Sequence, residues 1–266
     1  MRYDGRRWVR LVAPAQPTSR VLMFPHAGGG PSALLSVARM CPPDTEFWGL
    51  TLPGRESRAE DLSGDTVADL VASVGEEFAH RPALPTVNFG CSLGGLVAVR
   101  AAAAHPQLCE AVVVASQSPG ERDRLSESRV DVENVNEFLL AAGMTTPEIL
   151  EVTELREMLA ERLGSDLPLV NEGARNFSQV VCDQDIFVLA GIDDPVVPVD
   201  VMSGWRSHTR GTAIGIALFG GHFAFLEPGN GEIARLVFTR ACATAVDRHS
   251  RRHDDVQSVM NTRRTA

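Results

Sequence analysis

Ser92, Asp194 and His222 follow one another along the chain and carry the three side-chain types that can activate a hydroxyl as a nucleophile. A serine hydroxyl attacks poorly unless a base removes its proton, and a neutral imidazole is suited to that task near pH 7. The imidazole in turn needs a carboxylate to fix its tautomer and to stabilise its cation. If the fold brings these residues together, the expected chemistry is acyl transfer through a covalent intermediate on Ser92.

The surroundings of Ser92 favour this interpretation. The pattern Gly90-x-Ser92-x-Gly94 follows a short β-type run over 85–89 and precedes an Ala-rich, helix-forming stretch over 95–104. Strand, sharp turn and helix in this order are typical of a turn that exposes one serine above the end of a sheet. Each glycine is expected because a Cβ there would clash with the incoming strand or the outgoing helix. A strand–helix turn with an incidental serine is the alternative.

The acid and the base each have competitors. Asp193 and Asp194 are adjacent, and only one of them can point at the histidine; Asp194 is preferred because it precedes Pro195 at the turn, and Asp193 is the fallback. His222 follows an apolar run and a pair of glycines. The histidines that lack such a setting are His26, His80, His105, His208, His249 and His253.

Negative charge that develops on the substrate oxygen needs backbone N–H donors. We expect them from Leu93, directly after the serine, and from Ala27, in the glycine loop that follows the apolar run 21–24. His26, Gly28 and Phe223 flank these positions and are predicted to contact substrate. For His26 a role in packing the loop is the alternative.

Short apolar runs alternate with helical patterns, which predicts an α/β class with a mostly parallel central sheet and helices on both faces. Ligands bind such sheets at the carboxyl ends of the strands, where the glycine loop, Ser92, Asp194 and His222 all fall. The order serine, acid, histidine predicts an α/β-hydrolase fold.

The alternation breaks between 117 and 180, where helical pieces at 132–142, 147–152 and 154–163 are separated by joints at Gly143 and Gly164. We therefore predict one core domain from residues 1–116 and 181–246, interrupted by a helical lid over 117–180. The polar, Arg-rich segment 247–266 is predicted to be a disordered tail.

Composition excludes several classes of function. The net charge of −9 argues against nucleic-acid binding, and no apolar run is long enough for a membrane span. The five cysteines are scattered and lack a C-x-x-C pair, which argues for reduced thiols and against a disulfide frame or a metal site. With a polar N-terminal segment that does not resemble a signal peptide, these features predict a cytoplasmic protein without a cofactor.

With these residues in place, the chain resembles the type II (editing) thioesterases that accompany polyketide synthases and non-ribosomal peptide synthetases. The matching segments are F-P-H-A-G-G-G at 24–30, L-P-G-R-E-S-R at 52–58, G-C-S-L-G-G at 90–95, Gly191-x-x-Asp194-Pro195, Trp205 before His208-Thr209, and G-G-H-F at 220–223. The resemblance implies hydrolysis of acyl thioesters on the phosphopantetheine arm of acyl carrier or peptidyl carrier proteins.

Two departures from the family pattern stand out. Cys91 precedes the serine where the family usually has histidine; alternation along the strand points its side chain away from Ser92, so we predict packing beneath the turn. The lid segment 162–169 keeps Asp166 but lacks the arginine and tyrosine of the family motif. Arg55 and Arg58 are expected either to meet acidic groups of the carrier or its phosphate, or to form structural ion pairs near the rim of the site.

Two other functions stay open at this stage. The acyl group on Ser92 can pass to an amine, an alcohol or an internal nucleophile, which gives an acyltransferase or a cyclising release enzyme. A non-catalytic module that binds carrier proteins is the third hypothesis, and the presence of all three reactive side chains speaks against it.

Overall fold

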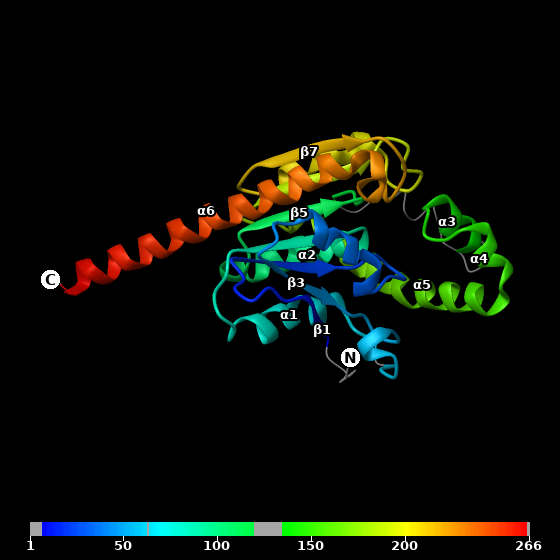
Figure 1. The fold of residues 1–266 in the computed structure, drawn as a ribbon, viewed down its shortest axis with the longest axis horizontal. Helices are drawn as coiled ribbons and strands as arrows, with labels where there is room; N and C mark the ends of the chain where they lie inside the picture. Colours follow the sequence, from blue (N-terminus) through cyan, green and yellow to red (C-terminus); the bar gives the residue numbers. More distant parts are fainter. Residues whose placement is uncertain (1–6, 63, 120–134, 265–266) are drawn as a thin grey trace.

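A sheet of seven strands forms the centre of the protein, in the order β1-β3-β2-β4-β5-β6-β7 (Figure 1). In this computed structural model the described residues are 7–62, 64–119 and 135–264. β1 pairs antiparallel with β3, and all other neighbouring strands are parallel, which confirms the mostly parallel sheet. The strands are β1 Trp8–Val12, β2 Ser19–Phe24, β3 Thr45–Leu50, β4 Thr86–Cys91, β5 Ala111–Ala115, β6 Asp185–Gly191 and β7 Ala213–Leu218.

Side chains that alternate along the strands divide the core into two layers. On β2, Leu22 and Phe24 belong to one buried cluster, while Val21 and Met23 belong to the other. The first cluster is completed by α1 (Val67–Phe78) and α2 (Leu93–Ala104), and the second by α6 (Gly231–Arg264) and the 3-10 segment Pro31–Met40. Helices thus cover both faces of the sheet, as the α/β pattern predicts. Other 3-10 segments are Glu56–Arg58, Pro106–Leu108, Phe177–Gln179, Val199–His208, Ala224–Leu226 and Pro228–Asn230.

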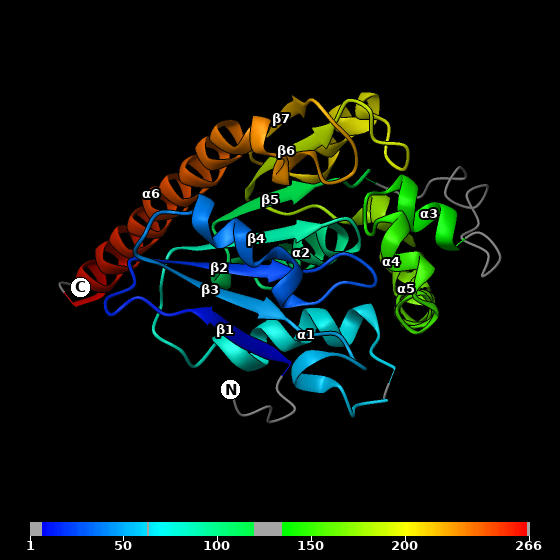
Figure 2. The same cartoon turned by 45° about the vertical axis from the view of Figure 1, so that its right-hand side comes forward.

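The helices α3 (Val135–Ala141), α4 (Pro147–Glu151) and α5 (Thr153–Ala174) lie between β5 and β6 in the chain, and we refer to them as the helical insertion. In Figure 2 the arrowheads of β2 to β5 point toward them, so the insertion lies at the carboxyl ends of the strands. Arg100 on α2 donates to the carbonyls of Gly173 and Arg175, which fixes the C-terminal end of α5 to the core.

The predicted joint at Gly164 is wrong, because α5 is one continuous helix through Gly164 and Pro168. Its buried side chains, Leu163, Asp166 and Leu169, recur every three residues on one face. Packing of this face outweighs the weak local helix propensity of the two residues.

The prediction of disorder from Asp247 onward is also wrong for the part of the chain that the structure describes, since α6 continues to Arg264. Arg248 donates to the carbonyl of Asp183, and both His249 and Arg252 contact the buried carboxylate of Glu110. Polar side chains therefore attach this part of the helix, and an analysis of apolar periodicity does not detect such attachment. No helix in the described part of the chain is long and apolar enough to cross a membrane.

Two local details follow from the residues involved. Thr66 caps α1 through a reciprocal pair of hydrogen bonds with Asp69, as a Thr-x-x-acid sequence favours. The segment Pro31–Met40 is a 3-10 helix that is kinked at Leu34.

Candidate active site

Ser92 lies at the corner between β4 and α2 with φ 50° and ψ −122°, a conformation that L-residues rarely adopt. Its N–H donates to the carbonyl of Ala115 at the end of β5, which fixes the corner to the neighbouring strand. The two glycines are required by close backbone contacts. A Cβ on Gly90 would lie 2.0 Å from the carbonyl oxygen of Gly94, and a Cβ on Gly94 would lie 2.0 Å from that of Phe24. The second clash involves the end of β2, not the incoming strand.

Cys91 precedes the corner and points the other way. Its side chain is fully buried in the core layer that α6 covers, whereas Ser92 is partly exposed. Burial raises the pKa of the Cys91 thiol, so the thiolate needed for nucleophilic attack is disfavoured. Cys91 is therefore a packing residue beneath the turn.

His222 and Asp194 come from the loops after β7 and β6 and are hydrogen-bonded to each other. The Nδ1 of His222 donates to Oδ2 of Asp194 over 2.8 Å, and both side chains are buried. The other carboxylate oxygen of Asp194 accepts from the backbone N–H groups of Val196 and Val197. Asp193 is exposed, so of the two adjacent acids only Asp194 contacts the histidine.

Ser92 and His222 are positioned from a common strand end, and among the described residues no hydrogen bond joins their side chains. The hydroxyl of Ser116, the residue after β5, donates to the carbonyl of His222, while Ala115 accepts from Ser92 N–H. Within the described residues, neither Ser92 Oγ nor His222 Nε2 makes a hydrogen bond. The structure thus contains the hydrogen bond between the histidine and the acid but not the one between the serine and the histidine. Such a hydrogen bond is often formed only when substrate is bound.

A cavity of about 690 Å³ lies beside these residues. It is bounded by the glycine loop, by the end of α3 with the residues that follow it (139–144), by α5, and by the loop after β7. Of the residues predicted for the site, His26, Gly28, His222 and Phe223 line this cavity, whereas Ser92, Ala27 and Leu93 are not part of its wall.

The His26 side chain packs inside the site. Its Nδ1 donates to the carbonyl of Ala27, and its ring meets Phe223 edge-on with centroids 5.0 Å apart. The pKa of His26 is lowered to about 4, chiefly by burial; the hydrogen bond to Ala27 opposes this shift, and the nearby His222 and Arg55 contribute to it. His26 is therefore a neutral donor at pH 7. It packs the loop and lines the cavity, and its contact with substrate stays a prediction.

The predicted oxyanion donors belong to two backbones that lie side by side. Leu93 is the first residue of α2, so its N–H has no acceptor within the helix. The close approach of Gly94 to Phe24 and Pro25 brings this helix start against the loop that continues into Ala27. In the described structure neither N–H is used by a loop or turn hydrogen bond.

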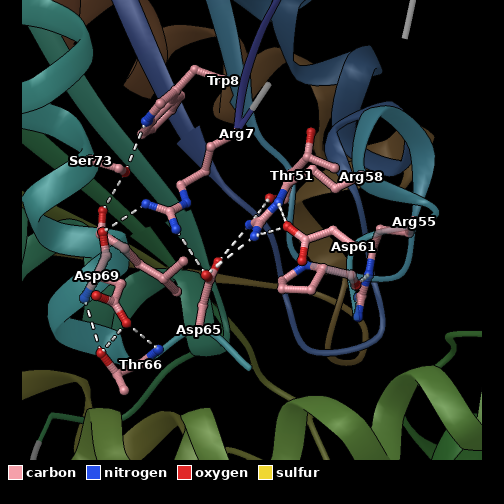
Figure 3. A network of polar contacts seen from close by, with 12 residues as sticks. Arg7, Trp8, Thr51, Arg55, Arg58, Asp61, Asp65, Thr66, Asp69 and Ser73 are labelled. Carbon is pink, nitrogen blue, oxygen red and sulfur yellow. Dashed lines mark hydrogen bonds and ion pairs between the residues drawn. The ribbon is translucent and has the colours of Figure 1, made fainter. Parts of the chain in front are cut away.

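Arg55 and Arg58 form buried ion pairs. Figure 3 shows the guanidinium of Arg58 among Asp61, Asp65 and Thr51, while the side chain of Arg55 points away from this cluster. Arg55 forms a bidentate pair with Asp166 of α5, with Nη1–Oδ2 and Nη2–Oδ1 distances of 2.7 and 2.8 Å. The structural alternative for the two arginines is thus the one observed.

Sequence reasoning assigned no role to Ser116 or Glu56, and none beyond the family resemblance to Asp166. Ser116 directly follows a buried apolar strand, the same signal that marked Ser92. Glu56 accepts from the N–H and hydroxyl of Ser32 and lines the cavity. Among the described residues no group of three or more His, Cys, Asp or Glu side chains is arranged to hold a metal ion.

Comparisons with known proteins identify the family and the fold. A model of the thioesterase domain matches residues 19–240. The chain is 30% identical to a probable cadicidin biosynthesis thioesterase of Streptomyces griseus, over 90% of this chain and 68% of that protein. It is 29% identical to the medium-chain S-acyl fatty acid synthase thioesterase of Homo sapiens, over 85% and 88% of the two chains. Among solved structures, YbtT, a type II thioesterase from the yersiniabactin NRPS/PKS biosynthetic pathway, superposes with a TM-score of 0.75 at 20% identity, covering 91% of this chain and 100% of that one. The chain therefore belongs to the thioesterase family and has the α/β-hydrolase fold of the type II thioesterases of polyketide and non-ribosomal peptide pathways.

Proposed function

We propose that the protein hydrolyses acyl groups from the phosphopantetheine arm of acyl carrier or peptidyl carrier proteins, through an acyl intermediate on Ser92. The observation that carries this proposal is the buried hydrogen bond between His222 and Asp194 beside a serine held in a strained corner. The names of the relatives, which include biosynthetic and fatty acid synthase thioesterases, support the class of substrate. The five free cysteines support a cytoplasmic location.

In the proposed reaction, Nε2 of His222 removes the proton of Ser92 as Oγ attacks the thioester carbon. The Nδ1–H of His222 remains bonded to Asp194, which stabilises the imidazolium that forms. Negative charge on the substrate oxygen is stabilised by the N–H groups of Ala27 and Leu93. The C–S bond then breaks, and the pantetheine thiol leaves with the proton held by His222.

In the second half of the proposed reaction a water molecule replaces the thiol. His222 removes a proton from the water, whose oxygen attacks the acyl carbon of the ester on Ser92. The ester bond breaks, the proton returns to Ser92, and a free carboxylic acid leaves. The cavity bounded by His26, Gly28 and Phe223 is proposed to hold the substrate next to the reacting atoms, with the helical insertion as its cover.

The test is incubation of the protein with a panel of acylated carrier proteins, followed by mass spectrometry of carrier and product. Free acid together with deacylated carrier supports the proposal. Acyl esters, amides or rings in place of free acid would replace hydrolysis by transfer to another nucleophile. A fluorophosphonate probe should label the wild type but not Ser92→Ala; absence of labelling in both, with intact carriers, would contradict any catalytic role.

A further inference from the structure

A single buried carboxylate joins three segments of the protein that are remote in the sequence. Asp166, on α5 of the helical insertion, accepts from both terminal nitrogens of Arg55 and, over 2.7 Å, from the backbone N–H of Gly28. The side chains of Arg55 and Asp166 are 2% and 3% exposed. The acceptor sites of the Asp166 carboxylate are thus occupied mainly by the glycine loop and the segment 53–58, and the buried group has little contact with water.

The same segment holds the rest of the glycine loop. Nη1 of Arg55 also donates to the carbonyl of Gly29 over 3.0 Å, and the carboxylate of Glu56 accepts from Ser32. Because Arg55 contacts both the glycine loop and Asp166, docking of α5 on the core adds to the contacts that fix the loop.

The position of Gly28 gives this junction a link to the proposed chemistry. Gly28 directly follows Ala27, the proposed oxyanion donor, so the orientation of one peptide group restricts that of the next. The bond to Asp166 also occupies the N–H of Gly28, which cannot then turn toward a substrate oxygen. Ala27 is left as the donor from this loop, facing the start of α2 at Leu93.

We propose that Asp166 is a positioning residue: it holds the glycine loop in the conformation that presents the Ala27 N–H to the substrate oxygen, and it makes that conformation depend on the docking of α5. This inference rests on the proposed function of the Ala27 and Leu93 N–H groups. When α5 docks on the core, the Ala27 N–H is brought into position for the substrate oxygen. When α5 is undocked, this donor is not held in place and Ser92 lacks part of its oxyanion site.

A neighbouring ion pair offers a matched control. Arg58 and Asp65 are as buried as Arg55 and Asp166, at 3% and 4% exposure, but they hold the segment to Thr51 and Arg7 (Figure 3). Among the described residues their side chains form no hydrogen bond with the glycine loop. Loss of this pair is expected to weaken the fold without moving Ala27. Asp65→Asn therefore separates destabilisation from a change in the site.

The experiment compares kcat, KM and the unfolding midpoint in the wild type, Asp166→Asn, the double variant Arg55→Met with Asp166→Leu, and Asp65→Asn, with a soluble acyl thioester as substrate. Asparagine removes the charge and one acceptor oxygen. If its oxygen takes the place of Oδ2, it can still accept from Gly28 and from Nη1 of Arg55, but its NH2 group then opposes Nη2 of Arg55. The double variant removes the buried charges together, which preserves stability better than leaving one of them unpaired, but it leaves the Gly28 N–H without an acceptor.

We expect kcat to fall about 10-fold in Asp166→Asn and about 100-fold in the double variant, with KM within about twofold, since misplaced groups and lost oxyanion donors act on the transition state. The unfolding midpoint should fall more in Asp166→Asn than in the double variant, which is the reverse of the order expected for kcat. Asp65→Asn should lower the midpoint and leave kcat unchanged.

Recovery of kcat together with stability in the double variant, or equal kcat in Asp166→Asn and Asp65→Asn, would overturn the inference. Failure of the proposed function is recognised separately, because the wild type would then not turn over the thioester. In that case the rate constant of Ser92 labelling by the fluorophosphonate, whose phosphoryl oxygen uses the same N–H donors, replaces kcat in the comparison.

Discussion

The imidazole of His222 and the carboxylate of Asp194 approach to 2.8 Å although their loops follow different strands of the sheet. Because Nδ1 is thereby the protonated nitrogen, Nε2 is free to act as a base toward Ser92. Asp194→Asn is expected to favour the other tautomer and to lower kcat about 10⁴-fold with the fold intact. Steady-state kinetics on an acyl thioester measures this. Asp193→Asn, at the exposed neighbouring acid, is the control and should retain wild-type kcat; a similar loss in both variants would contradict the assignment.

Ser92 and Cys91 are neighbours with opposite exposure, and their substitutions should have opposite effects. Ser92→Ala is expected to lower kcat by roughly 10⁶-fold and to leave the unfolding midpoint close to that of the wild type. Cys91→Ala should retain wild-type kcat. It should lower the free energy of unfolding by about 1 kcal/mol, because it removes only a buried sulfur. Kinetics and urea denaturation on both variants test the pair. An active Ser92→Ala with an inactive Cys91→Ala would make the cysteine the nucleophile.

The glycines of the corner should tolerate no side chain. Gly94→Ala brings a Cβ within 2.0 Å of the Phe24 carbonyl oxygen, which has no flexible end that can move away, so we expect a loss of about 3 kcal/mol or more in the free energy of unfolding. Gly164→Ala is the matched control, since that position lies inside α5 with no atom within 4 Å of the added Cβ. It should gain about 1 kcal/mol from helix propensity. Urea titrations measure both, and a stable Gly94→Ala would contradict the close packing of the corner.

Burial of His26 predicts a specific dependence of stability on pH. Its pKa is lowered from 6.5 to about 4 in the folded protein. Between these values the unfolded chain binds a proton that the folded protein does not, so the free energy of unfolding falls as pH decreases through this window, by at most about 1.4 kcal/mol per pH unit. Above pH 6.5 this effect is absent.

His26→Asn keeps a donor for the Ala27 carbonyl but does not titrate, so its stability should decline less steeply between pH 6.5 and 4 than that of the wild type. Urea denaturation at several pH values gives the comparison. His80→Asn, at an exposed histidine, is the control, and its profile should overlay that of the wild type. Identical slopes for His26→Asn and the wild type would show that the folded protein accommodates the charged imidazole.

The attachment of α6 predicts a cost of truncation. Ending the chain after Asp247 removes the contacts of His249 and Arg252 with Glu110, whose side chain is 1% exposed; among the described residues its carboxylate then keeps the Thr86 N–H as its one hydrogen-bond partner. We expect a loss of about 1–3 kcal/mol in the free energy of unfolding and no change in kcat. When Glu110→Gln is present in both lengths, the difference in stability between them should be smaller, because truncation then leaves no unpaired buried charge. A truncated protein as stable as the wild type would mean that these contacts contribute nothing.

Much of the fold could be predicted from local sequence. Buried parallel strands read as continuous apolar runs, and the strands end close to Ser92, Asp194 and His222, at Cys91, Gly191 and Leu218. The order of elements along the chain then implies the sheet, because parallel strands need helical crossovers.

What could not be predicted depends on contacts between distant segments. Arg55 and Asp166 are 111 residues apart, and no spacing rule pairs one arginine with one of many acids. The continuity of α5 through Gly164 and the extension of α6 beyond Asp247 oppose local propensity and depend on tertiary packing. The group that a Cβ on Gly94 would clash with was predicted wrongly for the same reason. It is the carbonyl of Phe24, which lies at the end of the neighbouring strand β2.

The capping of α5 by Arg100 divides the helical insertion into a fixed and an adjustable part. α5 is held at its C-terminal end by Arg100 and midway by Asp166, whereas the wall of the cavity over 139–144 comes from the end of α3 and the residues that follow it. With the cavity as the proposed acyl site, we expect chain-length preference to depend in part on that short stretch. Its exchange between relatives would then leave the reactive groups in place.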